Sequence, residues 1–153
     1  MPEEIDFHFS SPNDSPGYLI GQLTMLWQRK QKKVLDPLDL TQTQLALLAA
    51  LGWLSKKSDA VTQVDIARQS NADRMMVSKV LRTLVDKKFI TRREHPTDTR
   101  AKVIQLTPEG EKVLQKALAA VVDVDHEFFA VLDTDLSRFN ANMVTLIDIN
   151  KTE

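Results

Sequence analysis

Residues 61–106 constrain the fold of this chain more than any other stretch. They give, in order, the signals of a short helix, a tight turn, a second helix and a β-hairpin. Thr62, with Asp65 three positions on, can form a variant of the capping box at the start of the first helix. Asn71 tolerates the left-handed conformation that closes a helix, and Asp73 can cap the next one. This order predicts a mainly α fold with a small β-hairpin wing, that is, a winged helix-turn-helix.

The second helix of this unit has two unlike faces. An apolar stripe at helical spacing consists of Val77, Val80, Leu81, Leu84 and Val85. At about 100° per residue, the opposite side carries Met75, Lys79, Arg82 and Asp86, with Ser78 and Met76 on its flanks. Such a face suits a major groove, where cations meet phosphates or guanine edges. An ordinary amphipathic helix with a solvated outer face would have the same pattern, so both interpretations stay open at this point.

The hairpin favours the nucleic-acid interpretation. Two β-prone runs, residues 89–94 and 101–107, surround a turn and carry four cations, Arg92, Arg93, Arg100 and Lys102. From residue 62 to 110 there are ten Lys and Arg against six Asp and Glu, a charge of +4, whereas the rest of the chain carries −5. A basic module inside a nearly neutral protein is the electrostatic pattern expected of a DNA-binding unit.

Here the sequence resembles the MarR family of bacterial and archaeal transcriptional regulators. The resemblance rests on the order helix, recognition helix and wing, on Asp98-Thr-Arg100 within the wing, and on Val103-Ile-Gln-Leu-Thr-Pro-Glu-Gly110 directly after it. It covers roughly residues 16–146. It implies a homodimer that binds a roughly palindromic operator in double-stranded DNA. We expect a sequence-specific regulator, a repressor, that a small-molecule effector can release. The alternative is a winged-helix protein-interaction module without DNA binding.

The resemblance also implies residue roles. Met75, Ser78, Lys79 and Arg82 would face the major groove, Arg100 would reach the minor groove, and Asp98 would hold that arginine in place. The complete set of candidate DNA-binding residues is Thr62, Arg74, Met75, Ser78, Lys79, Arg82, Arg93, His95, Arg100 and Lys102. The sequence departs from the family at two points. Lys88 stands where a glycine usually ends the recognition helix, and Met75-Met76 replace small hydroxyl residues.

The flanking segments predict further helices. Ser15-Pro16 begins a helix that we expect to run to about Val34, and Asp36-Pro37 breaks it. Thr41 to Gln44 forms a capping box before an apolar helix that should close near Gly52. After the wing, Thr107-Pro108 begins a long helix to about Leu132, and Asp133 or Thr134 should cap a last one.

Three apolar stripes in the terminal helices need cover, which predicts a dimer. We expect residues 1–14 to be a flexible N-terminus, residues 15–35 and 108–149 to form a helical dimerisation region, and residues 41–107 to form the DNA-binding domain. A monomer whose stripes cover one another is the alternative. The basic run at 29–33 is a solvated face, a phosphate contact or a partner for acidic groups in the C-terminal arm.

Small-molecule binding has weaker signals. The resemblance implies a small aromatic or anionic ligand between the dimerisation arm and the DNA-binding domain, and Tyr18, Trp27 and Trp53 are the candidate residues. A core or interface role for these aromatics is the competing interpretation.

Several function classes are not supported by the sequence. The chain has no cysteine, which excludes disulfides and thiolate chemistry. His126 lies between Asp125 and Glu127, but adjacent residues diverge on a helix, so we predict neither a metal site nor a cofactor. There is no phosphate-binding loop or hydrolase motif, so we expect no enzyme activity. No apolar run could span a membrane, and the N-terminus is unlike a signal peptide, which favours a cytoplasmic protein.

Overall fold

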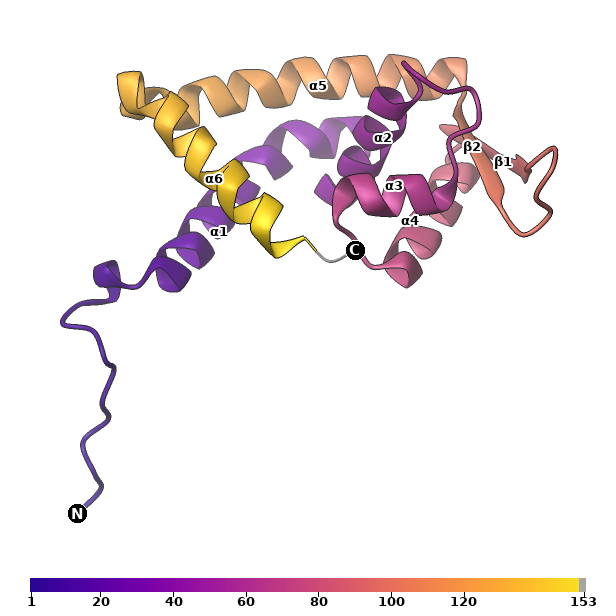
Figure 1. Ribbon diagram of the computed structural model, residues 1–153. Coiled ribbons are helices and arrows are strands. Elements are labelled where there is room, and N and C mark those ends of the chain that lie inside the picture. The colour runs from indigo at the N-terminus through magenta and orange to yellow at the C-terminus, as the bar shows by residue number, and fades with distance from the viewer. Residues whose placement is uncertain (152–153) are drawn as a thin grey trace.

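The computed structural model describes residues 1–151. This part of the chain is mostly helical, and its single two-stranded hairpin projects from one side of the helices (Figure 1). The elements are α1 (Pro16–Leu35), α2 (Gln42–Leu54), α3 (Gln63–Ser70), α4 (Arg74–Asp86), β1 (Ile90–Glu94), β2 (Lys102–Leu106), α5 (Pro108–Phe129) and α6 (Leu136–Asn150). Short 3₁₀ turns are η1 (Pro12–Asp14), η2 (Asp36–Leu38) and η3 (Ala130–Asp135). The predicted mainly α fold with a hairpin wing is confirmed.

The predicted capping residues begin most of the helices. Thr41 and Thr62 each form a complete capping box, with Gln44 and Asp65 respectively. Asp73 accepts a hydrogen bond from the Met75 amide at 2.7 Å and begins α4. Ser15 and Thr107 cap α1 and α5 in the same way, each followed by proline. Each side chain satisfies an amide that has no partner within its own helix.

Three boundary predictions are wrong. The helix expected to close near Gly52 continues to Leu54, because Gly52 serves a close contact: a Cβ there would lie 2.9 Å from Leu114 Cδ2 of α5. The helix expected to reach Leu132 ends at Phe129, where η3 tightens the chain. Neither Asp133 nor Thr134 caps the last helix. Asp133 has a left-handed φ of 46° inside η3, and Asp135 precedes α6 without a side-chain cap.

The core lies where α2 meets the winged helix. α2 is apolar nearly all round, and its Leu47, Leu48 and Leu51 are at most 1% exposed. They pack in one cluster with buried side chains of the other elements, including Leu35, Ile66, Leu81, Leu84, Ile90 and Ile104. The apolar stripe predicted for α4 therefore faces inward, and its opposite face is left to solvent.

Two left-handed residues close the helices of the helix-turn-helix. Asn71 has φ 51° after α3, as its side chain predicts, and Lys88 has φ 65° after α4. Each turn has the paired hydrogen bonds of a Schellman motif, which after α4 run from the Lys88 amide to Val85 O and from the Phe89 amide to Leu84 O. Lys88 thus takes the glycine-type backbone conformation despite its side chain.

The wing is an antiparallel hairpin with a third segment beside it. Its register pairs Ile90 with Leu106 and Glu94 with Lys102. On the other side of β2, the Ile104 amide donates to Val61 O at 2.9 Å, and Thr62 bridges to Val103. The start of α3 is therefore fastened to the wing, which fixes the wing relative to the helix-turn-helix.

The terminal helices form a separate arm. α5 runs along the top of the molecule in Figure 1, α1 packs beneath it, and α6 turns back from its far end through η3. None of the residues of α6 is buried, although it carries Met143, Ile147 and other large apolar side chains. Residues 1–11 extend away from the body at the start of α1 (Figure 1). Within the described chain, no helix has the length and apolar character to cross a membrane.

Candidate nucleic-acid interface

The outer face of α4 is a free surface in the protomer. Met75 is 82% exposed, and Arg74, Lys79 and Arg82 are exposed beside it, whereas Ser78 is half-buried. The inward stripe with Val77, Leu81 and Leu84 holds this face outward. The capping carboxylate of Asp73 keeps the first turn intact, so α4 presents its N-terminal residues on a rigid rod. Such a rod meets the steric requirement for entry into a major groove.

The tip of the wing is organised by two side chains that the sequence assigned other roles. His95 Nδ1 accepts hydrogen bonds from the amides of Thr97 and Asp98, both at 3.2 Å. Asp98 Oδ1 accepts from the Arg100 amide at 3.0 Å. Asp98 was expected to hold Arg100 in place, and in the structure its carboxylate binds the backbone amide of Arg100 and forms no ion pair with the guanidinium.

The wing leaves its cations at different exposures. Arg93 and Arg100 are exposed, while Arg92 and Lys102 are half-buried against the hairpin. Glu94 lies opposite Lys102 in the register, so the strand ends carry both charge signs. The guanidinium of Arg100, which comes directly after the wing turn, is free to extend beyond the protein surface.

Thr62 has a folding role in this structure. Its Oγ1 accepts from the Asp65 amide at 3.2 Å, and its own amide donates to Asp65 Oδ2 at 2.9 Å. The half-buried side chain lies where α3 begins, beside β2. At the other end of α3 lies a cation that was not among the predicted candidates: Arg68, in the last turn, lines a small hollow of about 290 Å³ together with Arg74.

The three aromatic candidates for effector binding do not come together. Trp27 Nε1 donates to Asp125 Oδ1 at 2.8 Å, between α1 and α5. Trp53 is 59% exposed at the end of α2, with Lys56 Nζ 4.4 Å from its ring centroid. Tyr18 lies beside the N-terminal segment, in a hollow with Phe7 and Phe9. The hypothesis that they line one cavity is wrong, because Tyr18 and Trp27 lie in different parts of α1 and contact different segments, and Trp53 lies at the end of α2.

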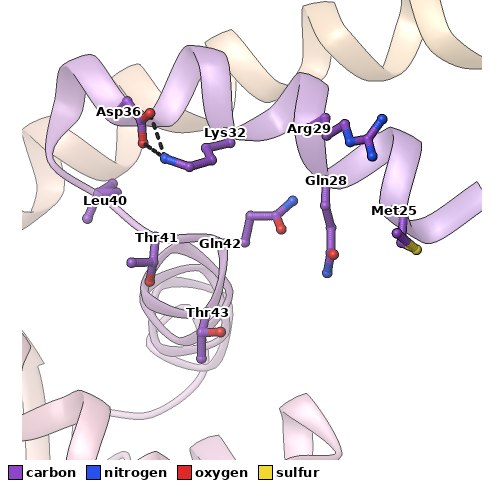
Figure 2. Close-up of a pocket in the computed structure, with 9 residues that line it drawn as sticks. All are labelled: Met25, Gln28, Arg29, Lys32, Asp36, Leu40, Thr41, Gln42 and Thr43. Carbon is purple, nitrogen blue, oxygen red and sulfur yellow. Dashed lines mark hydrogen bonds and ion pairs between the residues drawn. The ribbon is translucent and has the colours of Figure 1, made fainter. Parts of the chain in front are cut away.

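A hollow of about 500 Å³ between α1 and α2 is the better candidate for a ligand site. We call it the α1–α2 hollow; its lining residues are Met25, Gln28, Arg29, Lys32, Asp36, Leu40, Thr41, Gln42 and Thr43 (Figure 2). Lys32 forms an ion pair with Asp36 at 2.8 Å on its wall. Gln42 Nε2 is buried and has no hydrogen-bond partner in the described chain.

The sequence contained signals for the two walls of this hollow, although not for the hollow itself. Arg29 and Lys32 lie three residues apart in the basic run at 29–33, so they share a helix face. The break at Asp36-Pro37 returns the chain to the Thr41 capping box, which forms the opposite wall. Nothing in the sequence indicated that these two signals would lie side by side.

The acidic residues around His126 do not form a metal site. Asp125 points to α1, where it accepts hydrogen bonds from Trp27 and from Gln31, and His126 is exposed. Across residues 1–151, no group of three or more His, Cys, Asp or Glu is placed to hold a metal ion.

A helix-turn-helix with an exposed cationic second helix, fastened to a basic hairpin, defines the class of winged-helix DNA-binding proteins. Comparison with known proteins narrows the class. Residues 40–102 match the sequence model of the MarR family. The chain is 43% identical over 122 residues to the HTH-type transcriptional regulator YdcH of Bacillus subtilis (strain 168), and the match covers 80% of this chain and 83% of that protein. The chain belongs to the MarR family; it is a transcriptional regulator and not an enzyme.

Solved structures give the same fold. The S. aureus MepR–DNA complex superposes with a TM-score of 0.78 at 27% identity, covering 88% of this chain and 97% of that chain. CouR from Rhodococcus jostii RHA1 bound to p-coumaroyl-CoA superposes with a TM-score of 0.78 at 19% identity, covering 95% of this chain and 99% of that chain. The match to CouR concerns the fold alone.

Proposed function

We propose that this protein is a repressor that binds a two-fold symmetric operator as a homodimer and is released by a small anionic ligand. The observation that carries the proposal is the exposed cationic face of α4 next to the wing, held outward by the buried stripe. The MepR structure, determined as a DNA complex, supports this use of the shared fold. We place the protein in the cytoplasm, where a bacterial or archaeal regulator meets its operators.

We propose distinct roles for the residues of this interface. Lys79 and Arg82 contact phosphates or guanine edges, and Met75 packs on thymine methyl groups. Arg100 extends from the wing into the flanking minor groove, which is narrow and strongly negative in A·T-rich DNA. Peripheral contacts come from Arg68, Arg74, Ser78, Arg93 and Lys102. Thr62 and His95 act through the backbone segments that they hold in place. Phosphate contacts supply most of the affinity, so binding should weaken steeply as salt rises.

The uncovered faces of the arm support a dimer. α6 has no buried residue, and α1 exposes Tyr18, Leu19, Ile20, Leu23 and Leu26. Contiguous exposed apolar surface of this kind marks an association site in a water-soluble chain. We propose that residues 15–35 and 108–149 form the dimerisation region, while residues 41–107 form the DNA-binding domain. Two copies related by a two-fold axis would present their α4 helices about 34–36 Å apart, one helical turn of DNA.

The oligomeric state tests the arm directly. Ile147 is 49% exposed on α6, and Ile147→Glu places a charge on the proposed interface. We expect sedimentation equilibrium to give a dimer for the wild type and a folded monomer for this variant. Val64→Glu is the control, because Val64 is 40% exposed on α3, outside the arm. A monomeric wild type would contradict the dimer, and the stripes would then have no partner.

The DNA contacts are tested with operator fragments selected from genomic DNA. Arg82→Ala should weaken specific binding by about 1–3 kcal/mol while leaving the melting temperature unchanged. Arg100→Ala should lower affinity most for sites with A·T-rich flanks. Lys116→Ala removes an exposed cation from α5 as the control. Unchanged titrations for both arginine variants would rule out this mechanism.

A winged helix used for protein interaction is the rival function, and low-salt titration separates the two. A DNA-binding module should retard random-sequence duplexes, with log K falling by about 0.9 per log unit of salt for each phosphate contact. A winged helix that binds only proteins should show weak retardation and a shallow slope, because it makes few phosphate contacts.

The α1–α2 hollow is where we place the effector. Arg29, Lys32 and the unpartnered Gln42 Nε2 are donors suited to a carboxylate. A bound anion would compete with Asp36 for Lys32, so its binding should shift the surrounding helices. CouR, which shares the fold, was solved with p-coumaroyl-CoA bound and is a precedent for small-molecule binding in this fold. A panel of aromatic carboxylates should raise the melting temperature and weaken operator binding, and Arg29→Ala should reduce both effects together.

A further inference from the structure

We propose that Lys87 is a positioning residue that fixes the recognition helix α4 to the wall of the α1–α2 hollow, and that it does not contact DNA. The inference rests on the proposed DNA-binding function and adds to it the group that sets how α4 is presented. Lys87 follows α4 directly, as the residue before the left-handed Lys88. By sequence it contributes to the positive charge of residues 62–110, although it was not among the candidate DNA-binding residues.

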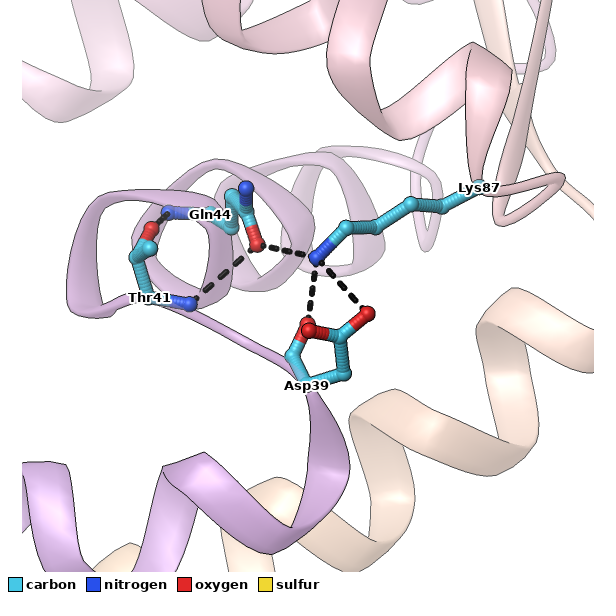
Figure 3. A network of polar contacts seen from close by, with 4 residues as sticks. All are labelled: Asp39, Thr41, Gln44 and Lys87. Carbon is cyan, nitrogen blue, oxygen red and sulfur yellow. Dashed lines mark hydrogen bonds and ion pairs between the residues drawn. The ribbon is translucent and has the colours of Figure 1, made fainter.

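The ammonium of Lys87 is already engaged by the protein (Figure 3). Nζ donates to the backbone carbonyl of Asp39 and to Gln44 Oε1 at 3.1 Å, and forms an ion pair with Asp39 Oδ2 at 3.3 Å. Two of the three N–H donors of the ammonium are thus in hydrogen bonds, and its charge is paired with the Asp39 carboxylate. The Lys87 side chain is 23% exposed, whereas the neighbouring Lys88 is exposed. A phosphate would have to break interactions that already exist.

The partners of Lys87 belong to the N-terminal end of α2. Gln44 is 8% exposed, and its Oε1 also accepts the Thr41 amide at 3.2 Å, in the capping box that begins α2. Asp39 has a left-handed φ of 55° in the turn that leads from η2 to Thr41. A single lysine therefore joins the end of α4 to the capping box of α2 and to the preceding turn, 48 residues earlier for Asp39 and 43 for Gln44.

The same turn forms one wall of the α1–α2 hollow. Asp36 and Thr41, which bracket Asp39, both line it (Figure 2). Asp36 is bound to Lys32 across the wall, and the Asp39 amide donates to Asp36 O at 3.0 Å. A movement of this wall reaches α4 through Lys87, because the other α4–α2 contacts are apolar and nondirectional. Lys87 is thus the directional link between the hollow and the helix presented to DNA.

The test compares two adjacent lysines. Lys87→Met keeps the length of the side chain and removes the ammonium, and Lys88→Met removes the same charge at an exposed position. We expect Lys87→Met to weaken binding of a selected operator about tenfold, with the salt slope unchanged and binding to random DNA nearly unchanged. Removal of a phosphate-binding lysine would instead lower the slope by about 0.9 for every phosphate that it neutralises. That result for Lys87→Met would overturn the proposal.

A double-mutant cycle identifies the partner. Gln44→Met removes the Oε1 acceptor, so its effect on operator affinity should be much smaller in the Lys87→Met background than in the wild type. Lys87→Arg, which keeps the charge and several donors, should recover part of the operator affinity. Additive effects of Lys87→Met and Gln44→Met would show that the hydrogen bond between them does not position α4.

Amide hydrogen exchange tests the link without DNA. Lys87→Met should speed exchange both in residues 36–44 and at the end of α4, while Lys88→Met should leave residues 36–44 unchanged. If the wild type binds no DNA, the proposed function fails, and the exchange result still decides whether Lys87 joins the two segments. If exchange in residues 36–44 is unaffected in Lys87→Met, the positioning role is wrong even where DNA binding is intact.

Discussion

The indole N–H of Trp27 donates to the carboxylate of Asp125 at 2.8 Å, across 98 residues of sequence. Gln31, one turn further along α1 and 3% exposed, donates to the same oxygen at 2.9 Å. Two neutral donors thus satisfy one carboxylate between α1 and α5, in place of a cation. The arrangement assigns Trp27 and Asp125 to holding the arm together. The sequence had suggested a ligand contact for Trp27 and no specific role for Asp125.

Replacing Trp27 with phenylalanine should destabilise the arm. The variant keeps an aromatic ring and removes one hydrogen bond to a charged acceptor, which is worth about 1–2 kcal/mol at this partly buried position. Urea denaturation followed by circular dichroism at fixed protein concentration measures the loss. Trp53→Phe is the matched control, because its exposed indole makes no hydrogen bond in the described residues. Equal effects of both substitutions would mean that ring size, and not the bond to Asp125, matters.

Alanine at Gly110 should be strongly destabilising. A Cβ at this position would overlap the backbone carbonyl of Phe89, next to the Thr107 cap that begins α5. Because a backbone atom cannot rotate away, we expect a loss of about 2–3 kcal/mol or more. Gly17→Ala in α1 meets nothing within 4 Å and should be neutral or slightly stabilising. Thermal denaturation of the two variants gives the comparison, and a Gly110→Ala protein as stable as the wild type would contradict the packing.

Glycine at Lys88 should stabilise the protein. Lys88 has φ 65°, a conformation that costs an L-residue with a Cβ roughly 1 kcal/mol and glycine almost nothing. Lys88→Ala removes the same charge and leaves the strain, so the difference in unfolding free energy between the two variants isolates the backbone effect. A Lys88→Gly variant no more stable than Lys88→Ala would show that the Schellman closure relaxes without cost.

Asparagine at His95 should preserve the wing, and alanine should not. His95 Nδ1 accepts two backbone amides, and an Asn side-chain oxygen can accept the amide two residues on in the same way. We expect His95→Ala to speed amide exchange in residues 95–101 and to weaken operator binding about threefold to tenfold, whereas His95→Asn should stay close to the wild type. If both variants lose affinity equally, the imidazole itself contacts DNA.

Local signals made most of the helix starts predictable. Each capping residue lies within two or three positions of the amide that it caps, so both partners of the interaction can be recognised in a short stretch of sequence. These residues are Ser15, Thr41, Thr62, Asp73 and Thr107. Helix ends were predicted less well. Gly52 and Asp133 were misassigned because a contact with Leu114 and the η3 turn, rather than local preference, decided those positions.

The outward face of α4 and its candidate residues could also be predicted from the sequence, because the helical spacing of apolar residues and the positions of the cations define them. The hydrogen bonds that His95 accepts were not predicted, nor was the contact of Asp98 with the amide of Arg100 rather than its side chain. Such bonds within a wing turn depend on a backbone path that composition does not specify. The separation of Tyr18, Trp27 and Trp53 was equally hidden, because it depends on which segments pack against each part of α1 and against the end of α2.

By itself the amino-acid sequence determined the order of elements, the inward stripe of α4 and the basic character of its surroundings, because each depends on residues close together in the chain. Only the tertiary structure decided that Lys87 faces Gln44 and Asp39 rather than solvent, that Asp125 serves α1, and that a hollow lies between α1 and α2. Each of these features joins segments that are distant in the sequence; Lys87 and Gln44, for example, are more than 40 residues apart. The packing of α2 against the winged helix and of α5 against α1 brings such segments together, and no local preference encodes that geometry.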